Sequence, residues 1–420
     1  MAYQNPKATR DFYPSEMEAR KQVFARLKTM AENYGFREVE TPVVEYTNLF
    51  TDKSGDEIKS QLFNLEKKGE EELSLRPELT PAVARMFIAK QKELPKPVKW
   101  YYLQKMWRYE KPQQGRLREF YQFGVELFGS DKTEADADVI NLAIDLLSSL
   151  GLTKKDFVIK VNNRKLLAGL LESLKLKNQE DIFRVIDKYR KLSKDDFLEE
   201  LKKAKADKKQ SDKIVELISL KKLSDFDKAA GGNEMAAKGL EELKRLFELM
   251  KQYGKQDCVE FDLSIARGLA YYTGIVFECY DKDESLRAIF GGGRYDNLVE
   301  LFKGMKEPAT GFAIGDVTLQ LLLEKKGLWP KPEKEIDYYI ANVDEASRKK
   351  AVEIADRLRK RYSVEIDLMG KKLAKQFDYA NTIKAKKVIV IGEDEIKSGK
   401  LTVKDMKTGK EEKIDASKLA

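Results

Sequence analysis

Hydrophobic and polar positions change their period along the chain, and each change predicts where helices give way to strands. Over residues 15–34 apolar residues recur at roughly helical spacing, and Gly35 follows as a stop signal. The next segment, REVETPVVEY, predicts a strand, although Pro42 confines it to an edge, a bulge or a subunit boundary. Residues 97–128 then predict a long hairpin.

The middle of the chain follows a different pattern. Between residues 166 and 251 it is strongly charged with helical periodicity, and no alternating strand pattern returns before CVEFDLS. Alternation resumes at YYTGIVFECY, and GGGRYDNLVELF predicts a glycine turn that enters a helix. We therefore expect one domain built from residues 1–160 and 255–327, interrupted by a helical insertion at residues 161–254.

A break at KKGLWPKPEKEID separates the last part of the chain. Gly327, Pro330 and Pro332 interrupt a helix and charged residues follow, which is the composition of an interdomain linker. Residues 333–420 then give a strand (DYYIANV), a helix, a strand (VEIDL), a helix and a strand (KKVIVIG). This order predicts a separate small α/β domain with a layered sheet.

Composition narrows the classes of function. The 420 residues, 42% of them hydrophobic, suffice for two or three cores, and Lys+Arg 79 against Asp+Glu 71 leaves +8, which permits RNA binding without requiring it. The chain has no histidine, which excludes Ser-His-Asp and Cys-His nucleophilic sites and the usual zinc hydrolases. Cys258 and Cys279 are too few for a disulfide framework or a four-thiolate zinc site. Without a leader-like start or a run of about 18 apolar residues, we expect a cytoplasmic protein.

The segment from residue 107 to residue 129 carries most of the candidate chemistry. On its second strand, alternation puts Gln122 and Glu126 on one face, opposite a uniformly apolar face that predicts core. On the preceding strand, Arg108 and Glu110 also share a face. These four side chains form either a surface salt-bridge lattice or part of a ligand site, and alternation alone leaves both open.

The loop between these strands, KPQQGRLR, is basic. It places Lys111, Arg116 and Arg118 on a hairpin tip, where cations can hold phosphates or a nucleic-acid end. The alternative is an ordinary basic turn.

The whole stretch WRYEKPQQGRLREFYQFGVELFG resembles motif 2 of class II aminoacyl-tRNA synthetases, and specifically of the histidyl-tRNA synthetases. Further resemblances follow in the order that this family has them. They are ATRDFYP, TPVVEYTNLF (motif 1), LRPELTPAVAR, VNNRKLLAGLLE, IARGLAYYTGIVFE and FGGGRYDNLV. The resemblance covers nearly the whole chain.

The resemblance implies a fold and an activity. The fold is a class II catalytic domain (α+β) on an antiparallel sheet with a helical insertion, followed by an α/β anticodon-binding domain. The activity is that of a histidine–tRNA ligase, which uses ATP and Mg²⁺ to convert L-histidine to histidyl-adenylate and transfers it to the 3′ end of tRNA(His). A homodimer through the motif 1 region is also implied, and no metal ligand is assigned.

The resemblance further assigns roles to residues. The catalytic residues are Arg108 and Arg267. The histidine-binding residues are Glu78, Thr80 and Gln122 for the α-amino group, and Glu126 and Tyr272 for the two imidazole nitrogens. The ATP-binding residues are Arg108, Glu110 and Arg116, and those near the tRNA acceptor end are Gln113, Gln114 and Arg118.

Two of these residues have simpler alternatives. Thr80, which precedes Pro81, is also a good helix N-cap followed by proline in the first turn. Tyr272 is also a good core residue within YYTGIVF. For Thr80 the two roles are compatible, and for Tyr272 core packing stays open as the alternative.

Four positions depart from the family pattern. Tyr121 stands where many members have histidine, Leu79 replaces a glycine and Ala270 replaces the aspartate of RGLDYY. In GFAIGDVTLQLLL, which resembles motif 3, Thr318 occupies the place of the arginine that holds the ATP tail. The triphosphate contact therefore needs another cation.

Three questions stay open at this stage. Arg116 or Arg294 is a candidate for that cation. A histidine-binding regulatory paralogue of ATP phosphoribosyltransferase, without tRNA charging, is the main rival; the loss at Thr318 favours it, whereas the C-terminal domain counts against it. The segment KLSKDD, from Lys191, resembles the class I KMSKS loop, but it lies within a charged helix pattern and lacks a histidine-containing partner motif.

Overall fold

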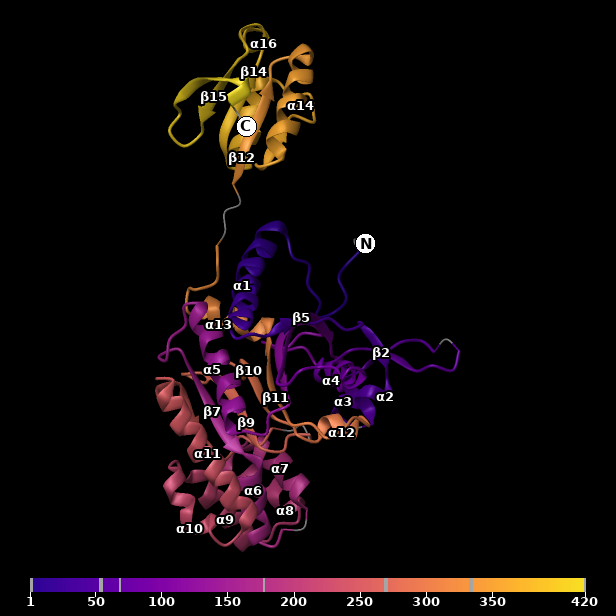
Figure 1. The fold of residues 1–420 in the computed structure, drawn as a ribbon, viewed down its shortest axis with the longest axis vertical. Helices are drawn as coiled ribbons and strands as arrows, with labels where there is room; N and C mark the ends of the chain where they lie inside the picture. The colour runs from indigo at the N-terminus through magenta and orange to yellow at the C-terminus, as the bar shows by residue number, and fades with distance from the viewer. Residues whose placement is uncertain are drawn as a thin grey trace. The chain divides into compact units, whose positions relative to one another are not determined.

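The computed structural model describes residues 3–52, 56–67, 69–176, 178–267, 271–331 and 335–418. The chain forms two compact units (Figure 1). The first comprises residues 1–12 and 19–330, and the second comprises residues 331–420 with the segment 13–18. Pro332, which we assigned to the linker, lies outside the described residues.

The first unit is built on an eight-stranded sheet in the order β1-β5-β6-β11-β10-β9-β7-β8. All neighbours are antiparallel except the two outermost pairs, β1 with β5 and β7 with β8. The antiparallel sheet is thus confirmed, with parallel pairing at its edges. Its strands are β1 (Arg37–Glu38), β5 (Val98–Trp107), β6 (Glu119–Phe128), β7 (Phe157–Asn163), β8 (Val259–Phe261), β9 (Ile275–Asp281), β10 (Phe290–Arg294) and β11 (Ala309–Gly315).

The segment REVETPVVEY forms two short strands in different sheets, where the sequence predicted one. After β1 the chain leaves the large sheet, and β2 (Val44–Tyr46) joins β4 (Leu73–Leu75) and β3 (Phe63–Asn64) in a three-stranded sheet. Pro42 has no N–H for a ladder, so the chain breaks there. Arg76 satisfies the carbonyls at the break, because its Nη1 donates to the oxygens of Thr41 (2.7 Å) and Pro42 (3.2 Å).

Helices cover the large sheet. The helix predicted at residues 15–34 is confirmed as α1, and Gly35 follows with φ +80°. The apolar face of β6 (Phe123, Val125, Leu127) is buried in the main core, as its alternation predicted. Helix α1 comprises Pro14–Asn33. The other helices of this unit outside the insertion are α2 (Asn48–Thr51), α3 (Asp56–Gln61), α4 (Thr80–Ala89), α5 (Thr133–Ser149), α12 (Leu298–Leu301) and α13 (Asp316–Lys325).

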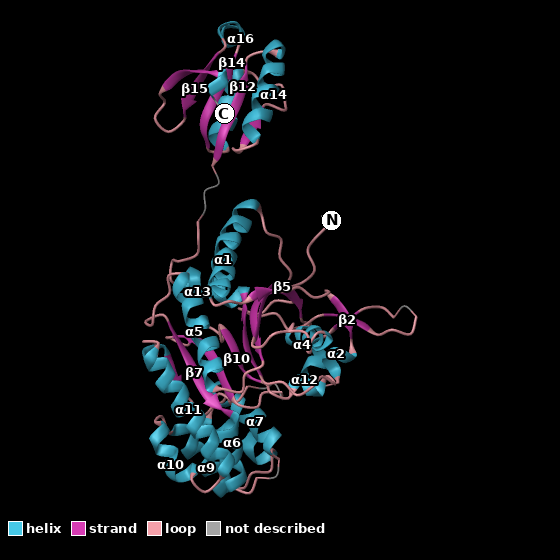
Figure 2. Ribbon diagram, in the orientation of Figure 1, coloured by secondary structure: helices cyan, strands magenta, loops and turns pink. Residues whose placement is uncertain are grey.

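The segment between β7 and β8 consists of helices joined by short turns and loops, with no strand among its described residues (Figure 2). Ser193 caps α8 by accepting a hydrogen bond from the Asp196 N–H, so KLSKDD begins an ordinary helix. The helices are α6 (Arg164–Ser173), α7 (Gln179–Asp187), α8 (Lys194–Lys203), α9 (Lys208–Ser219), α10 (Asp227–Ala230) and α11 (Glu234–Gln252), with 3-10 turns η1 (Tyr189–Lys191), η2 (Leu223–Phe226) and η3 (Gln256–Cys258).

The expected glycine turn in GGGRYD is wrong, because its three glycines lie within β10, between β9 and β11. A side chain has no room there. A Cβ on Gly292 would meet the Gly311 carbonyl, the Phe312 Cβ and the Phe277 ring, and one on Gly293 would lie 2.6 Å from the Ile275 carbonyl oxygen. The glycines therefore permit a central strand in a crowded layer.

The second unit has a five-stranded sheet in the order β13-β12-β14-β15-β16. The predicted strand–helix–strand–helix–strand order is confirmed, and α16 and the hairpin of β15 and β16 follow it without having been predicted. The elements are β12 (Ile336–Asn342), α14 (Glu345–Arg359), β13 (Val364–Ile366), α15 (Leu373–Thr382), β14 (Ala385–Ile391), α16 (Glu393–Ser398), β15 (Lys400–Asp405), β16 (Glu411–Asp415) and η4 (Ala416–Lys418). Across the described residues, none of the helices has the length and apolar character needed to cross a membrane.

Candidate active site

Glu126 is a buried acid in the middle of the large sheet. It lies on β6 opposite Gly311 of β11, and only 2% of the residue is exposed. Its Oε1 accepts a 2.7 Å hydrogen bond from the Thr80 hydroxyl, and its Oε2 accepts one from the Tyr295 hydroxyl. Burial raises the pKa of Glu126 to about 8, although the Thr80 hydrogen bond opposes the shift. The solvated edge that alternation allowed is therefore excluded at this position.

Thr80 does not cap α4, so the N-cap alternative is wrong. The capping position is Leu79, which offers no side-chain hydrogen bond, and Thr80 is the first helical residue. Its hydroxyl points instead to Glu126. The first residue of α4 therefore places its hydroxyl against Glu126 of the sheet.

Glu78 lies just before α4 and is also buried. Burial raises its pKa, while Arg108, the Tyr271 hydroxyl and Arg267 each lower it, so both proposed catalytic arginines act on this carboxyl. The Tyr271 hydroxyl donates to its Oε2 over 3.4 Å, whereas Oε1 has no partner among the described residues. An unpaired buried carboxylate oxygen is a binding position for a cation.

Three tyrosine rings pack around these acids. The Tyr272 ring centroid lies 4.9 Å from that of Tyr271 and 6.5 Å from that of Tyr295, and Tyr272 is 7% exposed within a hydrophobic cluster. The Tyr272 ring is thus packed in the core, as the simpler alternative predicted. Burial raises its pKa, which keeps the hydroxyl protonated and able to donate.

Arg267 forms an ion pair with Glu278 of β9, a residue that was not predicted from the sequence. The φ of Arg267 is +52°, and its Nη1 pairs with Glu278, which also accepts from the Tyr280 hydroxyl. A Cβ on Gly291 would occupy the place of this guanidinium. Burial lowers the pKa of Arg267, but Tyr272 and Glu278 outweigh it and keep the group charged. The signal in the sequence was a lone acid between apolar residues in IVFECY.

Arg108 follows β5 and does not join a salt-bridge lattice with the other three polar residues. Its Nε donates to the Pro77 carbonyl over 2.8 Å, and its guanidinium lies 5.4 Å from the Phe120 ring centroid. Glu110, which is 8% exposed, pairs instead with Arg116. The surface-lattice alternative is therefore wrong.

Gln122 is half-buried on β6, opposite Gln104 of β5. No described residue bonds to its side chain. The amide is thus available to a ligand on the same face of β6 as Glu126.

The hairpin tip between β5 and β6 is ordered by contacts within itself. Gln113 and Arg116 form an isolated bridge, and the Arg118 guanidinium lies 3.7 Å from the Tyr109 ring centroid. Arg118 also donates to the Glu110 carbonyl over 3.3 Å. Gln113 and Gln114 are exposed.

Arg294 is not available to a triphosphate in this structure. It is 3% exposed, donates to Asp136 over 2.8 and 2.9 Å, and donates to the Ser130 and Lys132 carbonyls. Our suggestion of Arg294 as the substitute for the motif 3 arginine is therefore wrong. The sequence could not show this, because Asp136 is 158 residues away.

None of the other departures that the structure describes bonds to Glu126. Leu79 is fully buried, and the Tyr121 ring lies 4.9 Å from the Arg20 guanidinium on the opposite face of β6. Thr318 is in α13, where its hydroxyl donates to the Ile289 carbonyl over 3.2 Å. Ala270 lies outside the described residues.

Comparison with known proteins supplies the family. The model of the histidyl-tRNA synthetase family matches residues 8–318, a range that includes Glu78, Arg108, Glu126 and Arg267. The chain belongs to the histidyl-tRNA synthetase family. The model of the anticodon binding domain matches residues 337–420, which are almost the whole of the second unit.

Sequence similarity to members of the family covers nearly the full chain. A histidine–tRNA ligase of Pyrococcus furiosus is 44% identical over 414 residues, which cover 97% of this chain and 95% of that protein. One of Haloarcula marismortui is 42% identical over 423 residues, which cover 99% and 96%.

Solved histidyl-tRNA synthetases share the fold. The apo enzyme of S. aureus has a TM-score of 0.76 at 26% identity and covers 100% of this chain and 98% of that chain. A Bacillus halodurans structure described as an ATP phosphoribosyltransferase regulatory subunit/histidyl-tRNA synthetase has a TM-score of 0.75 at 26% identity, with 90% and 96% covered. The predicted fold class is thus confirmed.

Proposed function

We propose that the chain activates L-histidine with ATP to histidyl-adenylate, transfers the histidyl group to the 3′ end of tRNA(His), and binds the substrate imidazole at Glu126. Membership of the histidyl-tRNA synthetase family and the full-length histidine–tRNA ligase relatives support the reaction. The observation that carries the site is the buried Glu126 carboxyl, with a hydroxyl on each oxygen and the tyrosine cluster around it.

Glu126 and Tyr272 suit a neutral imidazole, which has one N–H donor and one nitrogen acceptor. Glu126 accepts from the ring N–H, and the Tyr272 hydroxyl donates to the other nitrogen. At the other end of the amino acid, the unpaired oxygen of Glu78, with Thr80 and Gln122, receives the α-ammonium group. Every polar group of histidine except its carboxylate then has a partner.

That carboxylate is the nucleophile. One of its oxygens attacks the α-phosphorus of ATP, the bond to the bridging oxygen breaks, and pyrophosphate leaves with the electron pair. Arg108 and Arg267, which both act on Glu78, neutralise the charge that develops on the α-phosphoryl oxygens. In the second step the terminal ribose hydroxyl attacks the carbonyl carbon and AMP leaves.

Mg²⁺ is assigned to the nucleotide rather than to a site of the protein. Among the described residues no group of three or more acidic or thiol side chains is placed to hold a metal ion. A Mg²⁺ ion bound with ATP would take most of its ligands from phosphates and water. No residue is assigned to it.

The hairpin tip is the proposed contact with the tRNA acceptor end. Gln113 and Gln114 are exposed there, and Arg118 stacks on Tyr109 behind them. Glu110 and Arg116, ion-paired at the base of the same tip, are proposed to contact ATP. Under this proposal the acceptor end and the nucleotide bind to the same hairpin.

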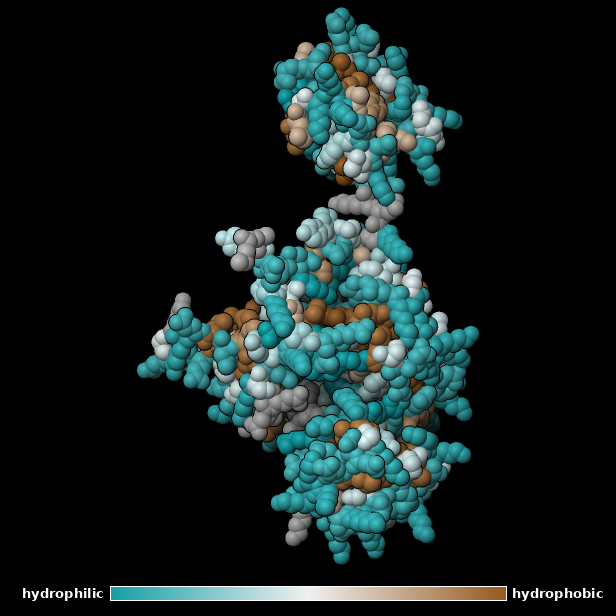
Figure 3. Space-filling model, turned by 180° about the vertical axis from the view of Figure 1, so that it is seen from behind, coloured by the Kyte–Doolittle hydropathy of each residue, from teal (hydrophilic) through white to brown (hydrophobic). Residues whose placement is uncertain are grey.

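A homodimer through the motif 1 region is proposed from exposed apolar side chains. Val43, Val44 and Tyr46 are 40%, 38% and 54% exposed, and Figure 3 shows apolar surface at the position of β2. A cluster of this kind on a small sheet is suited to a partner surface. A cytoplasmic location remains a prediction.

The proposed domain roles follow the boundaries expected from the sequence: catalysis in residues 1–160 and 255–327, the insertion in 161–254, and anticodon binding in 333–420. The match of the anticodon binding domain to residues 337–420 supports the last of these and favours the synthetase over the regulatory paralogue. Histidine-dependent ATP–pyrophosphate exchange, followed by charging of tRNA(His), tests the function. Binding of histidine without exchange would contradict it.

A further inference from the structure

Most of the arginines near the proposed ATP site form ion pairs with carboxylates of the chain. Arg116, Arg267 and Arg294 each pair with an acid of low exposure. Arg287, on the connection between β9 and β10, differs from them, because it pairs with no acid in the described part of the chain. Its side chain is half-exposed.

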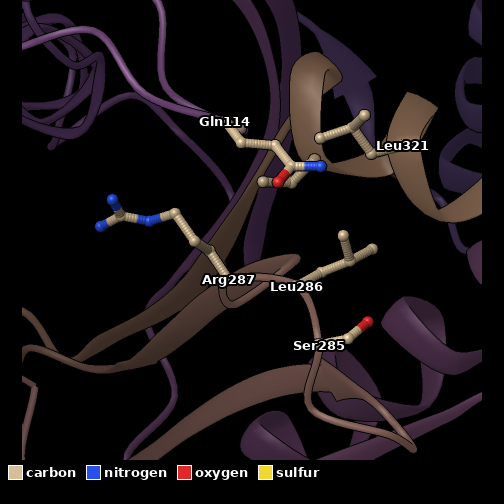
Figure 4. Close-up of a pocket in the computed structure, with 7 residues that line it drawn as sticks. Gln114, Ser285, Leu286, Arg287 and Leu321 are labelled. Atoms are coloured by element: carbon tan, nitrogen blue, oxygen red, sulfur yellow. The ribbon is translucent and has the colours of Figure 1, made fainter. Parts of the chain in front are cut away.

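Arg287 lies where three elements converge. A Cβ on Gly115, at the hairpin tip, would lie 3.1 Å from Thr318 Cγ2 and 3.8 Å from Arg287 Cδ. The three residues line a small pocket together with Gln114, Leu286 and Leu321. In Figure 4 the Arg287 guanidinium projects away from the Leu286 and Leu321 side chains, whereas the Gln114 side chain extends toward Leu321.

The pocket needs a cation if it is to hold phosphates, and α13 does not supply one. Thr318 is neutral, and its hydroxyl is already used on the Ile289 carbonyl. Leu321, one turn later, is apolar. Arg287 precedes Ile289 by two residues and lines the same pocket from the β9–β10 connection, and its planar guanidinium group is suited to phosphate oxygens.

We propose that Arg287 binds the terminal phosphates of ATP and supplies, from the β9–β10 connection, the charge that is lacking at Thr318. This inference rests on the proposed function and names the residue that holds the triphosphate tail. With Arg108 after the end of β5 and Arg287 on the β9–β10 connection, the two ends of the triphosphate are held by cations from different elements.

The test measures steady-state ATP–pyrophosphate exchange with Arg287→Ala and Arg287→Gln. Loss of a charge-assisted contact is expected to raise the KM for ATP and for pyrophosphate about tenfold to a hundredfold. The histidine KM and the inhibition constant of AMP, which has no terminal phosphates, are expected to stay within about threefold of wild type. Lys282→Ala removes another cation of the same connection, one that pairs with Glu260, and is the matched control.

The outcomes separate this inference from the function on which it rests. If the wild-type protein shows no histidine-dependent exchange, the proposed function fails. If exchange is present and Arg287→Ala leaves the ATP KM unchanged, only the role of Arg287 is overturned. An equal rise in the AMP inhibition constant, or a normal ATP KM in Arg287→Gln, would indicate a packing role and would also overturn it. Recovery of the ATP KM when Thr318→Arg is added to Arg287→Ala would support an exchange of charge between the two positions.

Discussion

Thr80 donates its hydroxyl to Glu126 over 2.7 Å, which joins the first turn of α4 to the middle of β6. This bond links a residue assigned to the α-amino group of histidine with one assigned to its ring. Since a carboxylate oxygen has two lone pairs, Glu126 can accept from Thr80, from Tyr295 and from a ring N–H at the same time. One hydrogen-bonded network can thus position both ends of the substrate.

The two ring contacts are expected to differ in strength. Truncating either leaves a buried ring nitrogen unpaired, and loss of the carboxylate costs more than loss of a neutral hydroxyl. Glu126→Gln is therefore expected to lower kcat/KM for histidine about a hundredfold or more, and Tyr272→Phe about tenfold. The ATP KM is expected to stay nearly constant in both, measured by pyrophosphate exchange.

Controls for this pair come from the second unit. Glu365→Gln and Tyr338→Phe make the same chemical changes on β13 and β12 and are expected to leave histidine activation unchanged. Wild-type histidine kinetics in Glu126→Gln would show that the ring is recognised elsewhere.

Histidine activation is expected to depend on the ionisation of Glu126. Its pKa of about 8 in the free protein means that, below that pH, a proton has to leave before the carboxylate can accept from the ring. The profile of kcat/KM for histidine should therefore fall as the pH drops below about 8. Because the Thr80 hydrogen bond lowers this pKa, Thr80→Val should move the limb to higher pH. Thr382→Val, at an exposed threonine of α15, is the control; an unmoved limb in Thr80→Val would contradict the assignment.

Local patterns in the sequence predicted the β5–β6 hairpin, which carries Gln122 and Glu126, better than they predicted the neighbouring strand β10. Alternation in EFYQFGVELF placed Gln122 and Glu126 on one face, and the structure has them on that face of β6. The hairpin of β5 and β6 was predicted for the same reason, since its strands are adjacent in sequence. The glycines of β10 were misread because composition indicates a turn, whereas crowding against Gly311 and Phe312 is visible only after pairing.

Residues joined by distant pairing could not be found from the sequence. Tyr295 reaches Glu126 across 169 residues because β11 lies between β10 and β6 in the sheet. Glu278 is only 11 residues from Arg267, but nothing in the sequence paired the two. The resemblance supplied Arg267 and Glu126 as candidates but not these partners. The buried pairing of Arg294 was hidden in the same way.

Arg294 is expected to act on stability rather than on ATP. Arg294→Ala would leave Asp136 buried without its partner, at a cost of about 3 to 5 kcal/mol in the free energy of unfolding. Adding Asp136→Asn should recover part of this loss. Urea unfolding measures the first effect, and the ATP KM of the folded protein should stay near wild type. A tenfold rise in ATP KM without loss of stability would return Arg294 to the list of nucleotide ligands.

Removing residues 333–420 is expected to separate the two half-reactions. The site residues all lie in the first unit, so the shortened chain should retain histidine-dependent pyrophosphate exchange. Charging of tRNA should fall severely, because the proposed anticodon contacts are lost. Circular dichroism confirms that the shortened protein is folded. Equal loss of exchange and charging in a folded protein would contradict the division of roles.

The same acid that is needed for histidine is expected to limit stability at alkaline pH. Glu126 has its pKa raised from 4.5 to about 8 in the folded protein, so the folded state retains a proton that the unfolded state releases. By linkage, its contribution is fully present below about pH 4.5 and is lost as the pH rises to about 8. A glutamine side chain cannot ionise, so the Tm of Glu126→Gln relative to wild type should rise between about pH 5 and pH 8. Differential scanning calorimetry, with Glu365→Gln as the control at a half-exposed acid, measures the difference. A difference that does not change with pH would show that Glu126 is ionised in the free protein.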